Sequence, residues 1–261
     1  MGNLDTYYNK FNEDKRLSRR HGIVEFTTSM KYIHDYIGEQ SGLKIIDIGA
    51  GTGGYSIPLS EEGHEVTAVE LAKPNLGKLK AKKSSVKAFW GTATDLKKFP
   101  SDYYDITILF GPMYHLIAHD DKLTALLEAK RVTKPGGYLF VAYCMNEYSV
   151  LTYGFKEHHA VECVESGRFD EDFNCTPMPD ELYDYVRMEE IDRLNLEANL
   201  KRVKILSPDG PANYMRTVLN SLSAEEFELF LQYHLSTCER PELLGAGAHT
   251  VDILQKNHFT E

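Results

Sequence analysis

A short glycine-rich segment constrains the fold of this chain more than any other feature. Residues 44–48, Lys-Ile-Ile-Asp-Ile, form an apolar, β-branched run that predicts a buried strand. Glycines follow at positions 49, 51, 53 and 54. A glycine-rich turn between a strand and a helix lets the backbone approach a ligand closely and offers unpaired N–H groups to it. The segment therefore predicts an α/β fold with a nucleotide-like ligand at this turn.

Strand and helix patterns continue to alternate along the chain. Further strands are expected at residues 64–70, 86–90, 104–110, 138–144, 201–206 and 250–254. Helices are expected at residues 12–38, 55–62, 74–83 and 121–132. Such alternation predicts βαβ units and a parallel sheet with right-handed crossovers. Ser-Ala-Glu-Glu at residues 223–226 is a capping box and predicts the start of another helix.

The length of 261 residues and the hydrophobic content of 42% suit one domain around one core. Within residues 1–261 we expect amino-terminal cap helices (1–40), a cofactor-binding core (41–144), and carboxy-terminal strands and helices that complete the sheet (201–261). Residues 145–200 interrupt the strand pattern and are rich in acidic and aromatic side chains. We expect a lid insertion there, because variable insertions on a fixed sheet are where specificity is built.

Charge and composition exclude several classes of protein. The formal net charge of -10 opposes extended contact with nucleic acid, which depends on many Lys and Arg side chains. No apolar run of about 18 residues is present, and the polar start lacks the apolar part of an export signal, so the expected location is the cytoplasm. The cysteines are widely spaced without a C-x-x-C pair, and His158, His159 and Cys163 lack a second ligand pair, so no metal is expected.

The glycine pattern fits two classes of nucleotide ligand. Gly49, Gly51 and Gly54 also satisfy the spacing found in dinucleotide-binding proteins. Asp47 precedes them, however, and a carboxylate there would repel a pyrophosphate but attract the ammonium or sulfonium of a charged amino-acid cofactor. Glu70 ends the second strand about twenty residues after the turn, where a carboxylate can accept hydrogen bonds from both ribose hydroxyls. These two acids favour a positively charged adenosine nucleoside.

These features resemble the class I S-adenosylmethionine-dependent methyltransferase family. The resemblance covers residues 41–144 and rests on Asp-Ile-Gly-Ala-Gly-Thr-Gly at 47–53, on Glu70, and on Gly-Thr-Ala-Thr-Asp-Leu at 91–96. It implies a Rossmann-like, doubly wound sheet of seven mostly parallel strands whose last strand is antiparallel. It further implies helices on both faces, a helical cap insertion, and S-adenosylmethionine as the cofactor.

The resemblance also implies the residues of the cofactor site. Asp47 and the glycine turn are expected to hold the methionine end, Glu70 the ribose, and the residues after the second and third strands the adenine. Many relatives carry Asp where this chain has Thr92, so Asp95 is the alternative partner for the adenine amine. The expected cofactor-binding residues are Asp47, Gly49, Ala50, Gly51, Gly53, Glu70, Leu71, Thr92, Ala93, Asp95, Phe110 and Gly111.

Candidate catalytic residues follow the fourth strand, where open α/β sheets place their chemistry. Tyr114 or His115 is expected beside the reacting methyl group; the alternative is that both only pack the loop. We predict His115 as a general base for a protonated amine, whereas an acceptor that arrives ionised needs none. Enzymes that methylate nucleobase amines carry Asp or Asn followed by two prolines here. This chain has Gly-Pro-Met at 111–113, so that activity is not expected.

The acceptor pocket is expected beneath the lid and the amino-terminal segment. Tyr7, Tyr8 and His115 are predicted to line it. Tyr7 and Tyr8 are also predicted to close over the cofactor as a flap, with local packing as the alternative. His249 precedes the last strand and is either a pocket residue or a core histidine. The many acidic side chains of the lid suit either a cationic acceptor or a solvated surface.

The predicted function is methyl transfer by in-line displacement to a small molecule with an O, N or S nucleophile. Such a reaction asks mainly for alignment and exclusion of water. Two alternatives remain open: an NAD-dependent oxidoreductase, and a non-catalytic cofactor-binding regulatory module. The expected partner is the small acceptor, with no membrane and no extended nucleic-acid contact, and the protein is expected to be a monomer or a homodimer.

Overall fold

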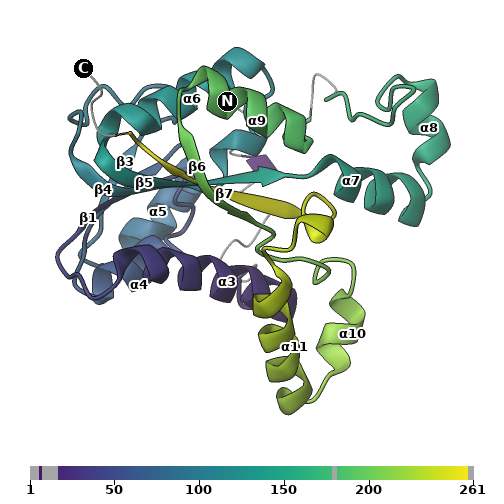
Figure 1. The fold of residues 1–261 in the computed structure, drawn as a ribbon, viewed down its shortest axis with the longest axis horizontal. Coiled ribbons are helices and arrows are strands. Elements are labelled where there is room, and N and C mark those ends of the chain that lie inside the picture. The colour runs from purple at the N-terminus through teal and green to yellow at the C-terminus, as the bar shows by residue number, and fades with distance from the viewer. Residues whose placement is uncertain (1–5, 8–16, 178–180, 258–261) are drawn as a thin grey trace.

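A sheet of seven strands organises the computed structural model, which describes residues 6–7, 17–177 and 181–257 (Figure 1). The strands are β1 (Lys44–Ile48), β2 (Glu65–Glu70), β3 (Lys87–Trp90), β4 (Tyr104–Leu109), β5 (Thr133–Cys144), β6 (Lys201–Leu206) and β7 (His249–Gln255). Their order is β3-β2-β1-β4-β5-β7-β6. Neighbours from β3 to β5 run parallel, whereas β7 is antiparallel to both β5 and β6. The predicted doubly wound sheet with an antiparallel last strand is confirmed.

Helices cover both faces of the sheet (Figure 1). One face carries α3 (Arg20–Ile37), α4 (Ser56–Glu61) and α5 (Lys73–Ala81). The other carries α6 (His119–Val132) and α9 (Met188–Glu197). The remaining short or peripheral helices are η1 (Pro112–Tyr114), α7 (Asn146–Ser149), η2 (Val150–Lys156), α8 (Ala160–Glu165), α10 (Arg216–Ser221), α11 (Ala224–Thr237) and η3 (Pro241–Leu243).

Adjacent residues of each central strand pack into opposite apolar layers. Ile45 and Phe140 lie with α3 and α4, whereas Ile46 and Leu139 lie with α6 and α9. All four side chains are fully buried. Because successive strand residues point to opposite faces, a sheet covered on both sides needs such unbroken apolar runs. Each buried side chain of this size contributes about 1.5–3 kcal/mol to stability.

The helix at residues 20–37 begins later than the pattern predicted, and residues 12–16 lie outside the described ranges. The predicted capping box is confirmed at the start of α11. Ser223 Oγ accepts a hydrogen bond from the Glu226 N–H at 3.1 Å, and the Glu226 carboxylate accepts one from the Ser223 N–H at 2.7 Å. The helices α10 and α11 extend from the body and pack on the start of α3 (Figure 1).

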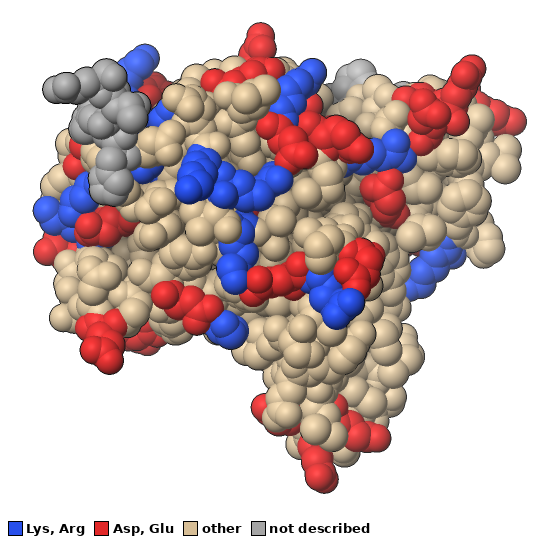
Figure 2. Space-filling model, viewed as in Figure 1, with Lys and Arg blue, Asp and Glu red and all other residues tan. Residues whose placement is uncertain are grey.

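The interval 145–200 contains α7, η2, α8 and α9, in line with a helical insertion between β5 and β6. Its last helix, α9, covers the sheet through the buried side chains of Ile191 and Leu194. On the face shown in Figure 2, acidic and basic side chains are interspersed. Within the described residues, no helix has both the length and the apolar character that crossing a bilayer requires.

Most of the candidate site residues predicted from the sequence lie near one edge of the sheet. The carboxyl ends of parallel strands meet at the same edge, which is where open α/β sheets bind their ligands. Because β7 is antiparallel to β5 and pairs His249 with Cys144, the start of β7 lies at this edge too. The same holds for the end of β6, since Leu206 pairs with Val251. The carboxyl ends of the six parallel strands and the start of β7 therefore lie at the same edge of the sheet.

Candidate cofactor and acceptor site

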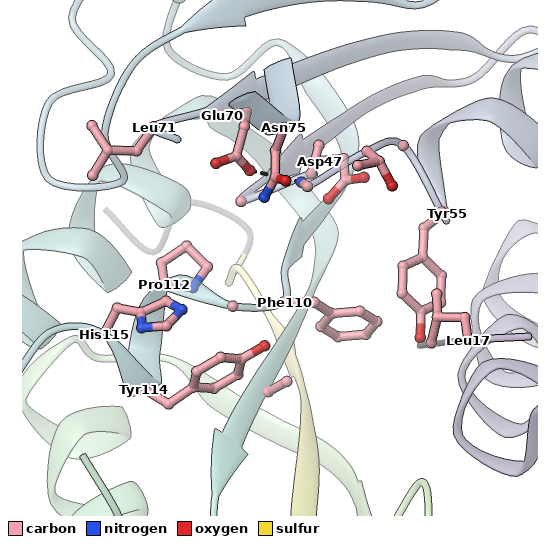
Figure 3. A pocket seen from close by; sticks show the side chains of 18 of the residues that line it. Leu17, Asp47, Tyr55, Glu70, Leu71, Asn75, Phe110, Pro112, Tyr114 and His115 are labelled. Carbon is pink, nitrogen blue, oxygen red and sulfur yellow. Dashed lines mark hydrogen bonds between the residues drawn. The ribbon is translucent and has the colours of Figure 1, made fainter. Parts of the chain in front are cut away.

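A cavity of about 880 Å³ opens at this edge of the sheet (Figure 3). Ligand pockets of roughly 300–1,000 Å³ bury most of a drug-sized molecule, so the cavity can take a nucleoside with a small second ligand beside it. Most of the residues predicted from the sequence line this cavity. They are Asp47, Gly49, Ala50, Gly51, Gly53, Glu70, Leu71, Thr92, Ala93, Phe110, Gly111, Tyr114 and His115.

Three predicted residues are placed differently. Asp95 does not belong to the described lining of the cavity; its side chain is 57% exposed, 4.0 Å from Lys97. Tyr7 is not part of that lining either, but its hydroxyl accepts a hydrogen bond from Tyr183 at 3.2 Å. Tyr8 lies outside the described residues.

The glycine turn folds tightly between the ends of β1, β2 and β4. Gly49 has a φ of 81° and Gly51 a φ of 57°, backbone conformations that residues other than glycine rarely adopt. A Cβ atom on Gly49 would stand 2.5 Å from Pro112 Cδ and 3.0 Å from the Phe110 carbonyl oxygen. The main chain of Gly49 donates a hydrogen bond to the carbonyl of Val69 at 2.8 Å. The turn therefore needs glycine both for its conformation and for its closeness to β4.

Asp47 is a buried carboxyl group on β1 that faces the cavity. The hydroxyl of Ser56 donates a hydrogen bond to it. Burial raises the pKa of Asp47 to about 6, although the hydrogen bonds from Ser56 lower it. Burial disfavours the charged form of a carboxyl group, and a positively charged group nearby stabilises that charged form. Asp47 therefore favours a cationic ligand and opposes an anionic one.

Glu70 joins the glycine turn to the start of α5. Its Oε2 atom accepts a hydrogen bond from the Gly51 N–H at 2.7 Å, and its Oε1 atom accepts one from the Ala72 N–H at 2.6 Å. The two main-chain donors therefore hold the carboxylate at the cavity wall.

Asn75 and Trp90 are cavity residues that the sequence did not reveal. Asn75, on α5, is 1% exposed and lies beside Glu70 (Figure 3), and its Oδ1 atom has no hydrogen-bond partner among the described residues. Leaving such a buried acceptor unpaired costs about 1–3 kcal/mol, so a ligand that donates a hydrogen bond here fits the site.

Trp90 Nε1 donates a hydrogen bond to the Leu71 carbonyl at 2.9 Å, which fixes the indole ring at the adjoining wall of the cavity. The position of Trp90 at the end of β3 is the sequence feature that could have predicted its place at the cavity.

Tyr114 and His115 form the opposite wall (Figure 3). The ring of Tyr114 stacks on Tyr183 at 5.8 Å, and its hydroxyl would be 3.6 Å from a Cβ atom on Gly111. His115 Nδ1 lies 2.7 Å from the Leu182 carbonyl oxygen. Because a carbonyl only accepts, Nδ1 carries the hydrogen, and Nε2 is the basic nitrogen of the neutral ring. The segment 181–183 therefore positions both predicted catalytic residues.

Further aromatic rings line the cavity beyond the glycine turn. Tyr55 makes an edge contact with Phe110 at 5.1 Å and lies 5.4 Å from Phe26 on α3. Tyr55 directly follows the glycines, and Phe26 belongs to the apolar stripe of α3. Aromatic walls of this kind suit an apolar or planar ligand.

A polar cluster lies beside the aromatic wall. Asp209 follows β6, His249 begins β7, and their side chains make a hydrogen bond of 2.7 Å between His249 Nδ1 and Asp209 Oδ2. Glu25 on α3 adds a third polar group, and one atom of each side chain lies within 4.8 Å of the others. The arrangement is that of an imidazole ring held in place by a buried carboxylate. The sequence left the position of His249 open and gave no sign of Asp209 or Glu25.

Comparisons with known proteins agree with this geometry. Residues 46–141 match the family model described as a methyltransferase domain. A demethylmenaquinone methyltransferase of Renibacterium salmoninarum is 33% identical over 124 residues, which cover 48% of this chain and 49% of that protein. The cypemycin N-terminal methyltransferase of a Streptomyces species is 32% identical over 127 residues, again 48% of this chain and 49% of that protein. The chain spans about half the length of the curated relatives it matches.

Solved structures show the same fold over nearly the whole chain. A structure of an S-adenosylmethionine-dependent methyltransferase from Thermotoga maritima superposes with a TM-score of 0.59 at 19% sequence identity. The superposition covers 96% of this chain and 98% of that one. The likeness thus includes β6 and β7, which lie beyond the part matched by the family model.

Proposed function

We propose that the protein transfers a methyl group from S-adenosylmethionine to a small-molecule acceptor, because residues 46–141 match the methyltransferase-domain model and the chain is similar to proteins named as methyltransferases. The observation that carries the proposal is the pair of carboxylates, Asp47 and Glu70, on either side of the glycine turn in one cavity. Asp47 would attract the positive methionine end, and Glu70 would accept hydrogen bonds from the ribose hydroxyls.

Asp47 and Asn75 argue against the NAD-dependent alternative. A diphosphate at the turn would meet the carboxylate of Asp47 in a buried place where charge is poorly screened. The unpaired Oδ1 atom of Asn75 is also an acceptor, which suits an ammonium or hydroxyl donor and not a phosphate oxygen. Both features support a cationic nucleoside.

We assign the remaining cofactor contacts to the residues that line the adjoining wall. Leu71 and Trp90 would contact the adenine face, and Thr92 and Ala93 its edge. Asp95 is retained only as the alternative partner for the adenine amine. We also propose that residues 145–200 act as the lid and that Tyr7, through its contact with Tyr183, helps to close it.

S-adenosylmethionine, when bound, supplies an activated methyl group on a positively charged sulfur. The chain then has to bind the two reactants, align them in line and exclude water, and good alignment is worth as much as ~7–11 kcal/mol. Tyr114 and His115 stand next to Gly111 and are proposed to position the acceptor. His115 would act as a base only for an amine acceptor that arrives protonated.

The aromatic wall supports an apolar, planar acceptor. The two similar proteins are named for demethylmenaquinone and for the N-terminus of cypemycin. A naphthoquinol and a peptide amine are therefore the first two classes of acceptor to test on this chain.

The test is transfer of isotope-labelled methyl from S-adenosylmethionine to these acceptors, with the demethylated cofactor measured in parallel. We expect label in an acceptor for the unchanged chain and for Asp35→Asn, a control on the exposed side of α3. We expect loss of transfer with Asp47→Asn. Cofactor binding without transfer to any acceptor would support the regulatory module instead, and hydride transfer with NAD would support an oxidoreductase.

A further inference from the structure

We propose that His249 and Asp209 form the proton-accepting pair of this site, and that the acceptor is a molecule whose nucleophile carries an ionisable hydrogen, such as a phenolic or hydroquinone O–H. This inference rests on the methyl transfer proposed above and adds a catalytic residue and an acceptor class to it. His249 lines the same cavity as Asp47 and Tyr114.

The sheet topology brings the pair together. Asp209 follows β6 and His249 begins β7, so the two residues are far apart in the chain but meet at the edge where the parallel strands end. At that edge the ring of His249 lies 6.1 Å from the ring of Tyr114. The hydroxyl of Tyr114 in turn is close to Gly111, beside the proposed methionine end.

Asp209 holds the imidazole in one orientation. The carboxylate is fully buried, and its Oδ2 atom accepts hydrogen bonds from His249 Nδ1 and from Asn213 Nδ2, each at 2.7 Å. Its Oδ1 atom accepts a third hydrogen bond from the main-chain N–H of His249 at 3.2 Å. Because a carboxylate only accepts, Nδ1 of His249 carries a hydrogen, and Nε2 is the nitrogen that can take a proton.

The surroundings favour the protonated ring. Five groups face His249: Asp209 after β6, Glu25 on α3, Cys144 opposite it on β5, Tyr114 on η1 and Tyr148 on α7. Burial lowers the pKa of His249, but the interactions with Cys144 and Asp209 outweigh it and raise that pKa well above its usual value. The neutral ring is therefore a stronger base than an unperturbed imidazole, and it accepts the acceptor's proton at pH values above this raised pKa.

His115 differs from His249 in its partner. Its Nδ1 atom donates to a main-chain carbonyl, that of Leu182, which carries no net charge. A buried carboxylate stabilises an imidazolium more strongly than a neutral carbonyl does. Since one side chain with a carboxylate partner is enough to remove a proton, His115 is left to position the acceptor.

The proposed step transfers one proton to His249 and one methyl group to the acceptor oxygen. The proton of the acceptor's O–H passes to Nε2 of His249, and the oxygen lone pair forms the new bond to the methyl carbon. The carbon–sulfur bond breaks with its electrons going to sulfur, which leaves a neutral thioether. The proton on His249 is then released to water. General-base assistance of this kind typically contributes 10²–10⁴-fold in rate.

The experiment compares two acceptors in the full chain: 1,4-naphthohydroquinone, whose O–H is not ionised near neutral pH, and thiophenol, which is largely ionised there. We expect His249→Asn to lower kcat about 10²–10⁴-fold for the hydroquinone and much less for thiophenol. Calorimetric binding of S-adenosylhomocysteine should stay within about twofold, which also shows that the variant is folded. The matched control is His34→Asn on α3, a histidine with a 45% exposed side chain that contacts Glu62, with unchanged rates.

A second variant separates proton transfer from packing. Asp209→Asn removes the carboxylate that raises the pKa of His249, so the rise of kcat/KM with pH for the hydroquinone should move to lower pH. An unchanged pH profile in Asp209→Asn would show that His249 and Asp209 do not accept the proton. An equal loss of kcat for both acceptors in His249→Asn would show the same. Loss of activity in EDTA with recovery on adding Mg²⁺ or Zn²⁺ would overturn the proposed pair too, in favour of a metal ion near Glu25. If the unchanged chain methylates neither acceptor nor any other, the proposed function itself fails.

Discussion

The close approach of Gly49 to β4 yields a prediction that can be worked out from the structure. In Gly49→Ala the new residue would have to keep a φ of 81°, which costs roughly 1–2 kcal/mol for a residue with a Cβ atom. The Cβ atom would also stand 2.5 Å from Pro112 Cδ and 3.0 Å from the Phe110 carbonyl oxygen. Both neighbours are part of the chain around η1 and have little freedom to withdraw, and overpacking typically costs about 1–3 kcal/mol. The expected loss of stability is therefore about 2–5 kcal/mol.

A matched control isolates the contact from the backbone strain. Gly63 has a φ of 92°, and a Cβ atom there would meet nothing within 4 Å. Gly63→Ala should therefore lose only the roughly 1–2 kcal/mol of the unfavourable φ. The assay is urea unfolding of both variants with the free energy extrapolated to water. Equal losses in the two variants would show that the turn is not packed against β4, and the close-contact account of the site would be wrong.

Three further predictions concern the site and the fold. The pKa of Asp47 is raised in the folded chain, so the folded state holds a proton on Asp47 at pH values where the unfolded state has lost it. The free energy of unfolding should therefore fall by about 3 kcal/mol as pH rises from about 4 to above 6. Asp47→Asn should remove this pH dependence in urea unfolding and should weaken the binding of S-adenosylmethionine. Glu70→Gln should weaken that binding about tenfold to a hundredfold in calorimetry, because hydrogen bonds to a charged acceptor are lost; an unchanged affinity would remove Glu70 from the ribose site. Ser223→Ala should lower the thermal stability by about 1 kcal/mol through loss of the cap of α11, and no change in melting would contradict that cap.

Local sequence patterns predicted the strands and the glycine turn because both depend on neighbouring residues. Asp47, Gly49 and Glu70 stand at the ends of β1 and β2, and each was placed by its distance from a recognisable strand. Asp95 was expected at the adenine edge from the family resemblance, as the alternative to Thr92. In the structure Thr92 and Asp95 pair across a tight turn, and the Asp95 side chain is directed to solvent while Thr92 lines the cavity.

Residues whose position depends on tertiary structure were missed. Asn75 reaches the cavity from one side of α5, and a single buried amide on a lysine-rich helix leaves no periodic pattern. Asp209 comes into contact with His249 only because β7 runs antiparallel between β5 and β6. Strand direction and order are set by packing of the whole sheet, so the pairing of these two residues was not readable from spacing along the chain.

The contacts of the segment 181–183 also depend on how residues 145–200 fold. Leu182 accepts the hydrogen bond from His115, and Tyr183 stacks on Tyr114 and donates to Tyr7. The lid was expected over the acceptor, but which of its residues would reach the site could not be predicted without its fold. These contacts join the segment 181–183 to the segment after β4, which carries Tyr114 and His115.

The most direct measurement is calorimetric titration of the full chain with S-adenosylmethionine, S-adenosylhomocysteine and NAD under the same conditions. If Asp47 and the glycine turn hold a cationic nucleoside, the first two ligands bind and S-adenosylmethionine binds less tightly to Asp47→Asn, while NAD gives no heat of binding. Uptake of NAD by a chain that ignores both adenosyl compounds would contradict this.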